Sequence, residues 1–236
     1  MRRSAIRTAE EAARRVLPRS IARPLGAIRV LIAVRYLLVD HGLFRSMRTQ
    51  RSVDAAGRPI PWYTFPAIAW LDELDFSDAE VFEYGSGHST LWWQERARGV
   101  TSVEHDPDWY AEVDQRVGAS TVLLLETDPD RYVAAAEDGS YDVVVIDGVH
   151  RPGCAEVAAS VLRPGGLLIL DNAERYPQLS QRLRTLGLIE IDFTGFSPVN
   201  YYISTTSVFL DRAFHRPPRD VQPRVPIGGV PEDVCG

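Results

Sequence analysis

VFEYGSGHST, residues 81–90, is an apolar run that ends in an acid and a glycine turn. Gly85 and Gly87 carry no Cβ and can adopt positive φ, so a ligand can approach the backbone at the carboxyl end of a parallel strand. Ser89 and Thr90 are typical of a helix start, whose free N–H groups would face the same pocket. The stretch therefore predicts a strand, a turn that accepts a nucleoside and a helix in succession.

A second apolar run, residues 100–103, also ends in an acid, Glu104. Its separation from the first run is that of consecutive strands in a βαβ unit. Glu104 is then placed to accept hydrogen bonds from two ribose hydroxyls. The alternative is a solvated acid in a loop.

Two further buried strands deliver polar residues at their ends. Residues 141–146 form a β-branched run that leads to Asp147, and residues 167–170 lead to Asp171 and Asn172 after a helix that ends at the turn 163–166. Strand ends of a parallel sheet open on one edge, so these three side chains can converge there. Two carboxylates and an amide oxygen suit Mg²⁺. The alternative is a loop acid and a helix cap.

These motifs resemble those of the class I S-adenosylmethionine-dependent methyltransferases, in which an E/D-x-G-x-G turn holds the methionine part of the cofactor and the next strand's acid holds its ribose. A dinucleotide dehydrogenase is the competing interpretation, but Thr90 occupies its third glycine position. The resemblance implies an α/β fold, a doubly wound Rossmann-like sheet of seven mostly parallel strands with an antiparallel last strand. Residues 188–193 and 204–210 match its terminal pair.

Within that class, the chain resembles the metal-dependent O-methyltransferases of the catechol and caffeoyl-coenzyme A type over residues 63–210. Their pattern implies that Asp147, Asp171 and Asn172 bind a metal, and that Asp147 also serves in catalysis. The family usually has a lysine base three residues after the first aspartate, where this chain has His150. Histidine can take that role because its ordinary pKa is about 6.5. The chain contains no lysine, which suggests a GC-rich bacterial genome.

The resemblance also implies a set of cofactor-binding residues along the carboxyl edge of the sheet. They come from the segment before the first strand, the glycine turn, the second strand's end and the turns after the third and fourth strands. These residues are Tyr63, Thr64, Glu83, Gly85, Ser86, Gly87, Ser89, Glu104, His105, Asp128 and Asp147. For Tyr63 and Thr64, packing is the alternative role.

Charge divides the chain unevenly. Residues 1–51 hold twelve Arg against three acids, a balance of +9, so the remainder is −15 within the total of −6. The apolar stretch 25–39 contains two Arg and is too short to span a bilayer. We expect residues 1–60 to be an Arg-rich helical arm, 61–212 the methyltransferase domain and 213–236 a Pro-rich tail. The arm is expected to cover the active-site edge or to form a homodimer contact, with weak membrane-surface contact as the alternative.

The sequence thus predicts a bacterial, cytoplasmic enzyme that uses S-adenosylmethionine and Mg²⁺ to methylate a hydroxyl of a small polar acceptor. A saccharide or glycan is the first choice, because residues 195–202 mix aromatic and amide side chains, and no nucleic-acid partner is expected. A catechol-like acceptor is the second choice. A non-catalytic, cofactor-binding regulatory protein is the alternative from another class.

Overall fold

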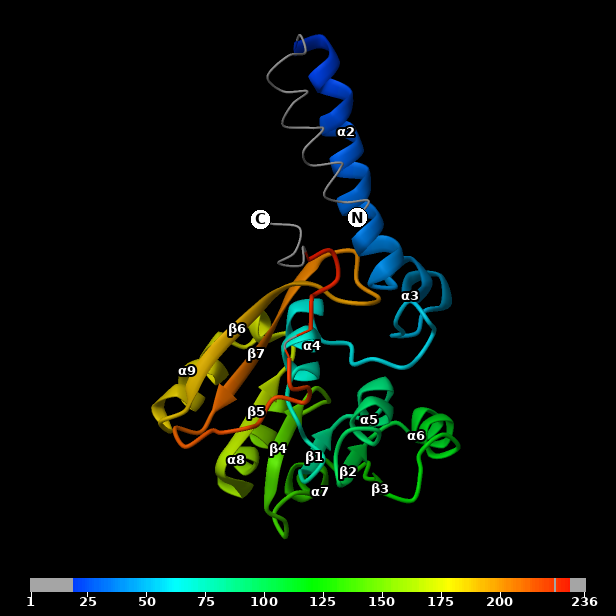
Figure 1. Cartoon of the computed structure of the whole chain (residues 1–236). Coiled ribbons are helices and arrows are strands. Elements are labelled where there is room, and N and C mark those ends of the chain that lie inside the picture. The colour runs from blue at the N-terminus through cyan, green and yellow to red at the C-terminus, as the bar shows by residue number, and fades with distance from the viewer. Residues whose placement is uncertain (1–18, 223, 230–236) are drawn as a thin grey trace.

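The computed structural model describes residues 19–222 and 224–229. Its centre is a seven-stranded sheet in the order β3-β2-β1-β4-β5-β7-β6 (Figure 1). The strands are β1 Glu80–Tyr84, β2 Gly99–Glu104, β3 Thr121–Leu125, β4 Tyr141–Ile146, β5 Leu162–Leu170, β6 Ile189–Phe196 and β7 Ile203–Leu210. The first five are parallel, and β7 is antiparallel to both β5 and β6. This arrangement confirms the predicted fold class.

Helices and helical turns precede, connect and flank these strands. They are α2 Arg19–Arg35, the π-helical turn η1 Tyr36–Asp40, α3 Leu43–Thr49, α4 Phe65–Asp72, α5 His88–Trp93, α6 Pro107–Asp114, α7 Pro129–Ala134, α8 Arg151–Val161, the 3₁₀ turn η2 Ala173–Arg175 and α9 Pro177–Thr185. Proline begins α6, α7 and α9, where a missing N–H leaves no helical bond unmade. Asp106 also caps α6 by accepting hydrogen bonds from two backbone N–H groups.

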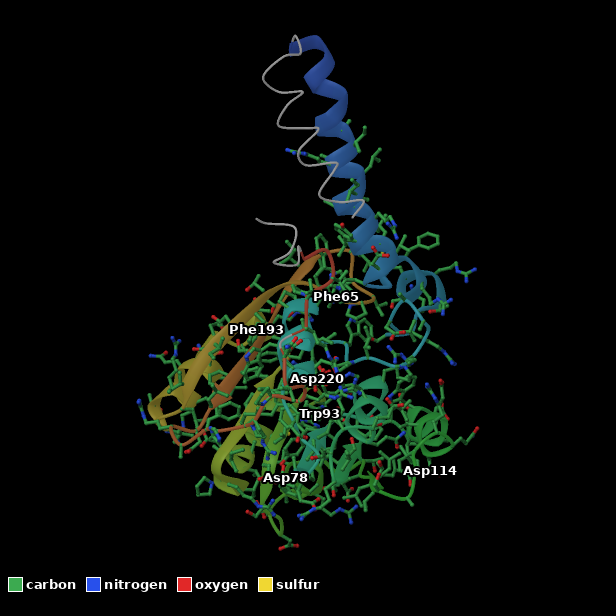
Figure 2. All side chains as sticks on the ribbon, in the orientation of Figure 1. Phe65, Asp78, Trp93, Asp114, Phe193 and Asp220 are labelled. Atoms are coloured by element: carbon green, nitrogen blue, oxygen red, sulfur yellow. The ribbon has the colours of Figure 1, made fainter. Side chains whose placement is uncertain are left out.

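Alternation along the strands produces two separate cores. Val81, Val143 and Leu167 face the side that packs against α4 and α5, where Trp93 is fully buried (Figure 2). Phe82, Val144 and Leu168 face the other side, with side chains of α7, α8 and α9. Strands buried on both faces are continuous apolar runs in the sequence, which explains why β4 has the predicted bounds.

One predicted boundary was wrong. The segment 163–166 was expected to be a turn before a strand at 167, yet β5 begins at Leu162, directly after α8. The strand pairs Tyr141 with Leu162 and then Val143 with Leu167, so the extra residues form an irregularity in the register. A bulge of this kind accommodates Pro164 and Gly165, which a regular central strand would not.

The described part of the N-terminal arm is helical, as predicted, but α2 projects away from the sheet (Figure 1). Its apolar side chains extend into open space in Figure 2, and the exposed fraction is 50% for Ile28 and 67% for Leu31. The following helix α3 packs on the body through Leu43. Among the described residues, no helix is both long and apolar enough to cross a membrane. Residues 1–18 of the expected arm lie outside the description.

The described part of the C-terminal segment, residues 213–222 and 224–229, is bound to the body of the protein. Pro217 accepts a hydrogen bond from the Asp75 N–H, and the Arg219 N–H donates to the Glu73 carbonyl at 2.8 Å. Arg216, whose side chain is 9% exposed, forms ion pairs with Asp78 and Asp142. The segment thereby covers the end of α4 and the start of β1. Residue 223 and residues 230–236 of the predicted tail are not part of the description.

Candidate active site

The site begins where the turns after β1 and β4 meet. Gly85 has φ of +90°, and a Cβ there would lie 2.9 Å from the Cα of Gly148. The Asp147 N–H also donates to the Tyr84 carbonyl at 3.0 Å. Because β1 lies between β2 and β4, this contact is at the point where the strand order reverses, the usual ligand crevice of such a sheet.

Glu83 lies fully buried beneath the glycine turn. Its Oε2 accepts hydrogen bonds from the hydroxyls of Thr90 and Ser102, the latter at 2.9 Å, while Oε1 has no partner among the described residues. Burial raises the pKa of Glu83 to about 7, although the hydroxyls of Ser89, Thr90 and Ser102 act in the opposite direction. The side chain therefore presents one unbonded carboxylate oxygen inside the predicted cofactor site.

Glu104 organises the turns on the other side of the crevice. One oxygen accepts from the N–H and the hydroxyl of Ser86 at 3.0 and 2.9 Å. The other accepts from the N–H groups of His105 and Asp106 and lies 2.9 Å from Nδ1 of His105. The carboxylate is only 3% exposed. Ribose hydroxyls would therefore share its oxygens with Ser86 and His105, or displace those side-chain contacts.

The segment before α4 crosses this edge and is tied to the far half of the sheet. Tyr63 is fully buried, and its hydroxyl accepts a hydrogen bond from the Trp93 indole at 3.4 Å. Burial raises its pKa well above the ordinary value, and the charges of Glu83, Asp147 and Asp171 add to this effect. These effects place Tyr63 among the acids of the site.

Thr64 is committed to structural bonds in this conformation. Its hydroxyl donates to the Phe193 carbonyl at 2.8 Å, and its N–H donates to the hydroxyl of Thr206 at 2.9 Å. Thr206 in turn donates to Oδ1 of Asp171 at 2.6 Å. Thr64 thus helps to fix Asp171, the packing role that the sequence left open.

Asp147, Asp171 and Asn172 do come together, as predicted, but around a side chain that the sequence analysis did not select. Nη2 of Arg151 lies 3.1 Å from the side-chain Oδ1 of Asp147 and 3.5 Å from that of Asn172, whereas Nη1 donates to the backbone carbonyl of Asp171. Burial raises the pKa of Asp171 well above its usual range, and the charge of Asp147 adds to this. Burial also raises the pKa of Asp147, against the effect of Arg151.

This arrangement does not fit the predicted magnesium ion. Two of the oxygens expected to bind Mg²⁺, Oδ1 of Asp147 and Oδ1 of Asn172, already face the guanidinium, and Oδ1 of Asp171 accepts the hydrogen bond of Thr206. A second cation at the same oxygens would be repelled by the first. The magnesium prediction is therefore not supported, and the chemistry proposed below uses no metal.

His150 lies at the rim of the site, immediately before α8. It has φ of +53° and an exposed side chain, and its ring meets the ring of Tyr132 edge to face at 6.0 Å. The structure gives its imidazole no contact with Asp147 or Asp171 among the described residues. His150 thus stands at the predicted edge of the sheet, turned toward α7.

Two more residues concern the cofactor site: Asp128, which was predicted, and Trp109, which was not. Asp128 is exposed and caps α7, accepting from the Arg131 N–H at 3.0 Å, so its expected approach to the adenine would compete with this cap. Trp109 was missed: its indole N–H donates to the Ser86 carbonyl at 2.8 Å, and its ring covers Gly87. A tryptophan early in the helix after β2 was the available sequence signal.

Comparisons with known proteins gave one family match and several similar solved structures. The profile of the family described as Methyltransferase domain matches residues 82–173. No curated protein sequence matches the chain. Similar solved structures include precorrin-6y C5,15-methyltransferase from Geobacter metallireducens, at 12% identity, TM-score 0.49, and 62% and 87% coverage of this chain and that one.

A second similar structure is a methyltransferase-like protein from Silicibacter pomeroyi, at 22% identity, TM-score 0.44, and 64% and 89% coverage of this chain and that one. A third is an O-methyltransferase family protein from Burkholderia thailandensis. It has 15% identity, a TM-score of 0.45 and coverage of 62% and 55%.

Proposed function

We propose that the chain is a class I S-adenosylmethionine-dependent methyltransferase that methylates a hydroxyl of a small polar acceptor, a saccharide or glycan; residues 82–173 match the profile described as Methyltransferase domain. The observation that carries the proposal is the gathering of Glu83, Glu104 and Asp147 around the Gly85 turn, where β1 meets β4. Each acid closes or follows a parallel strand, so all three face one crevice.

The cofactor would lie across this turn. The unbonded Oε1 of Glu83 offers an acceptor for the ammonium group of the methionine part. Glu104 would bind the ribose at the neighbouring strand end, and the N–H groups at the start of α5 would receive the carboxylate. Glu83 in β1 and Glu104 in the neighbouring strand β2 would thus bind successive parts of the cofactor.

The acceptor is proposed to bind beside β5. The loop 197–202 extends beyond the carboxyl end of this strand, because β7 is antiparallel to β5 and Ser207 pairs with Leu170. Tyr201 is 82% exposed, and Tyr202 accepts a hydrogen bond from Arg175 at 2.9 Å. Exposed aromatic rings beside a charged side chain suit a sugar ring, which presents both apolar C–H groups and hydroxyls.

Methyl transfer would then be a direct displacement. Bound S-adenosylmethionine would supply the methyl group to the acceptor oxygen, and its release as the neutral thioether S-adenosylhomocysteine would balance the transfer. The hydroxyl proton passes to His150, the exposed imidazole at this rim, which remains the proposed base. Asp147, with its raised pKa, is the competing proton acceptor.

A transfer assay with radiolabelled S-adenosylmethionine tests the proposal. Mono- and oligosaccharides, catechols and a buffer blank would be compared, each with and without EDTA. We expect label in saccharide products. Label only in catechols would transfer the assignment to the catechol-like alternative, and label in neither class from protein that binds S-adenosylhomocysteine would refute a hydroxyl acceptor of these kinds.

A further inference from the structure

Arg151, the first residue of α8, has its guanidinium buried at the ends of β4 and β5. The side chain is 9% exposed, although arginine is rarely buried without partners. Nε donates to the Gly148 carbonyl at 2.9 Å, and Nη2 donates to the Asp147 carbonyl at 3.0 Å. Nη1 donates to the Asp171 carbonyl. Three backbone carbonyls of the two strand ends therefore point at one side chain.

The same guanidinium meets the side chains expected to bind a metal. Nη2 lies 3.1 Å from Oδ1 of Asp147 and 3.5 Å from Oδ1 of Asn172, and the charge of Arg151 also acts on Asp171. Its carbon lies 5.2 Å from the centre of the Tyr176 ring, which covers its other side. All three nitrogens are thus engaged by oxygens, and the site is already neutralised by a charge that belongs to the chain.

We propose that the Arg151 guanidinium is the resident cation of this site: it holds Asp147, Asp171 and Asn172 in place and keeps divalent metal ions out. The inference rests on the proposed function only in that both concern the residues at the ends of β4 and β5. Two carboxylates and an amide oxygen would attract Mg²⁺ or Mn²⁺ if they were free. The fixed positive charge removes that attraction, acts on the charge of Asp171, and occupies the side-chain oxygens of Asp147 and Asn172.

The consequence for the enzyme is that turnover does not depend on a divalent ion. Arg151 is a positioning residue, since it acts through the two aspartates rather than on the cofactor or acceptor. A guanidinium cannot lose its proton at any working pH, so this compensation is permanent. A metal, by contrast, would exchange with solvent and would respond to chelators.

The test is Mn²⁺ binding, followed by electron paramagnetic resonance, because it needs no turnover. Wild-type protein is expected to leave Mn²⁺ free. Arg151→Gln removes the charge and exposes the oxygen ligands, so it should bind Mn²⁺ more tightly than wild type by about tenfold or more. Arg151→Lys keeps a positive charge at this position and should bind Mn²⁺ no better than wild type.

Arg163→Gln is the matched control, because Arg163 pairs with Asp142 at 2.6 Å at the opposite end of β4. It should leave Mn²⁺ free. If Arg151→Gln does not fold, Arg151→Met replaces it and keeps the apolar stem. Mn²⁺ bound by wild type and lost in Asp171→Asn would overturn the proposal, as would folded Gln and Met variants that bind no Mn²⁺. Absence of methyl transfer by wild type would count against the proposed function and leave this measurement intact.

Discussion

Glu83→Gln should stabilise the protein at pH 8 and change how its stability depends on pH. Glu83 is fully buried. Among the described residues its carboxylate forms no ion pair, and its Oε1 has no hydrogen-bond partner. Burial raises the pKa of this carboxyl from an ordinary 4.5 to about 7. Glutamine has nearly the same shape and can keep the hydrogen bonds to Thr90 and Ser102, but it carries no charge to desolvate.

The sign follows from the two pKa values. Below pH 4.5 the carboxyl is protonated in both the folded and the unfolded chain, so its full contribution to stability is present. Between pH 4.5 and 7 the unfolded chain loses the proton first, and stability falls; above pH 7 the loss is complete. The difference between 7 and 4.5, at about 1.4 kcal/mol per pH unit, amounts to about 3 kcal/mol.

Urea unfolding of wild type and Glu83→Gln, from pH 5 to 8.5, measures this difference. We expect the free energy of unfolding of Glu83→Gln, relative to that of wild type, to increase from pH 5 to about pH 7 and to stay constant above it. Ser102→Ala should extend the rise to higher pH, because the Ser102 hydroxyl lowers the pKa of Glu83. A difference between wild type and Glu83→Gln that does not vary with pH would show that Glu83 is ionised throughout and would refute this reasoning.

The remaining predictions concern the cofactor site, the base and the arm. Glu104→Gln should weaken S-adenosylhomocysteine binding by about 1.5–3 kcal/mol, as hydrogen bonds to a charged acceptor do, and unchanged affinity in calorimetry would remove it from the ribose site. Gly85→Ala should cost about 1–3 kcal/mol in urea unfolding. It should cost more than Gly187→Ala, which has the same φ of +90° but no atom within 4 Å of the added Cβ, and equal losses would contradict the close approach. His150→Gln should lower turnover by about 10²–10⁴-fold and flatten the pH–rate profile, whereas near-normal turnover would leave Asp147 as the base. Leu31→Asp should reduce cosedimentation with vesicles that contain anionic phospholipid, and unchanged cosedimentation would count against membrane-surface contact by α2.

The central strands could be predicted because their burial is continuous. Residues 143–146 are apolar and rich in β-branched side chains, a composition and length that favour a strand buried on both faces. The start of β5 could not, because the residues 163–166 carry every signal of a turn and the sheet absorbs them in a bulge. The direction of α2 could not be predicted either. Neither the order of its apolar residues nor its charge indicates whether it lies on the sheet or projects from it.

The acids of the site could also be predicted, since each follows a strand and parallel strands share an edge. What the sequence could not supply was their bonding. Thr64 and Thr206 join Asp171 across a sequence separation that no local pattern records. The sequence likewise leaves open whether Glu104 faces a ligand or its own loop, and the structure shows four protein N–H and O–H groups already directed at it.

Arg151 provides the physical argument against the predicted metal. A cation in the first turn of a helix is unfavourable, because the helix dipole is positive there, and burial makes it more so. Its place at the start of α8 is therefore sustained by its partners: three carbonyls and the carboxylates of Asp147 and Asp171. The buried carboxylate of Asp171 and the partly buried carboxylate of Asp147 need a positive charge as much as Arg151 needs a negative one. The sequence indicates this pairing only through the spacing of four residues between Asp147 and Arg151. That spacing predicts an ion pair only once the ends of β4 and β5 are known to lie together.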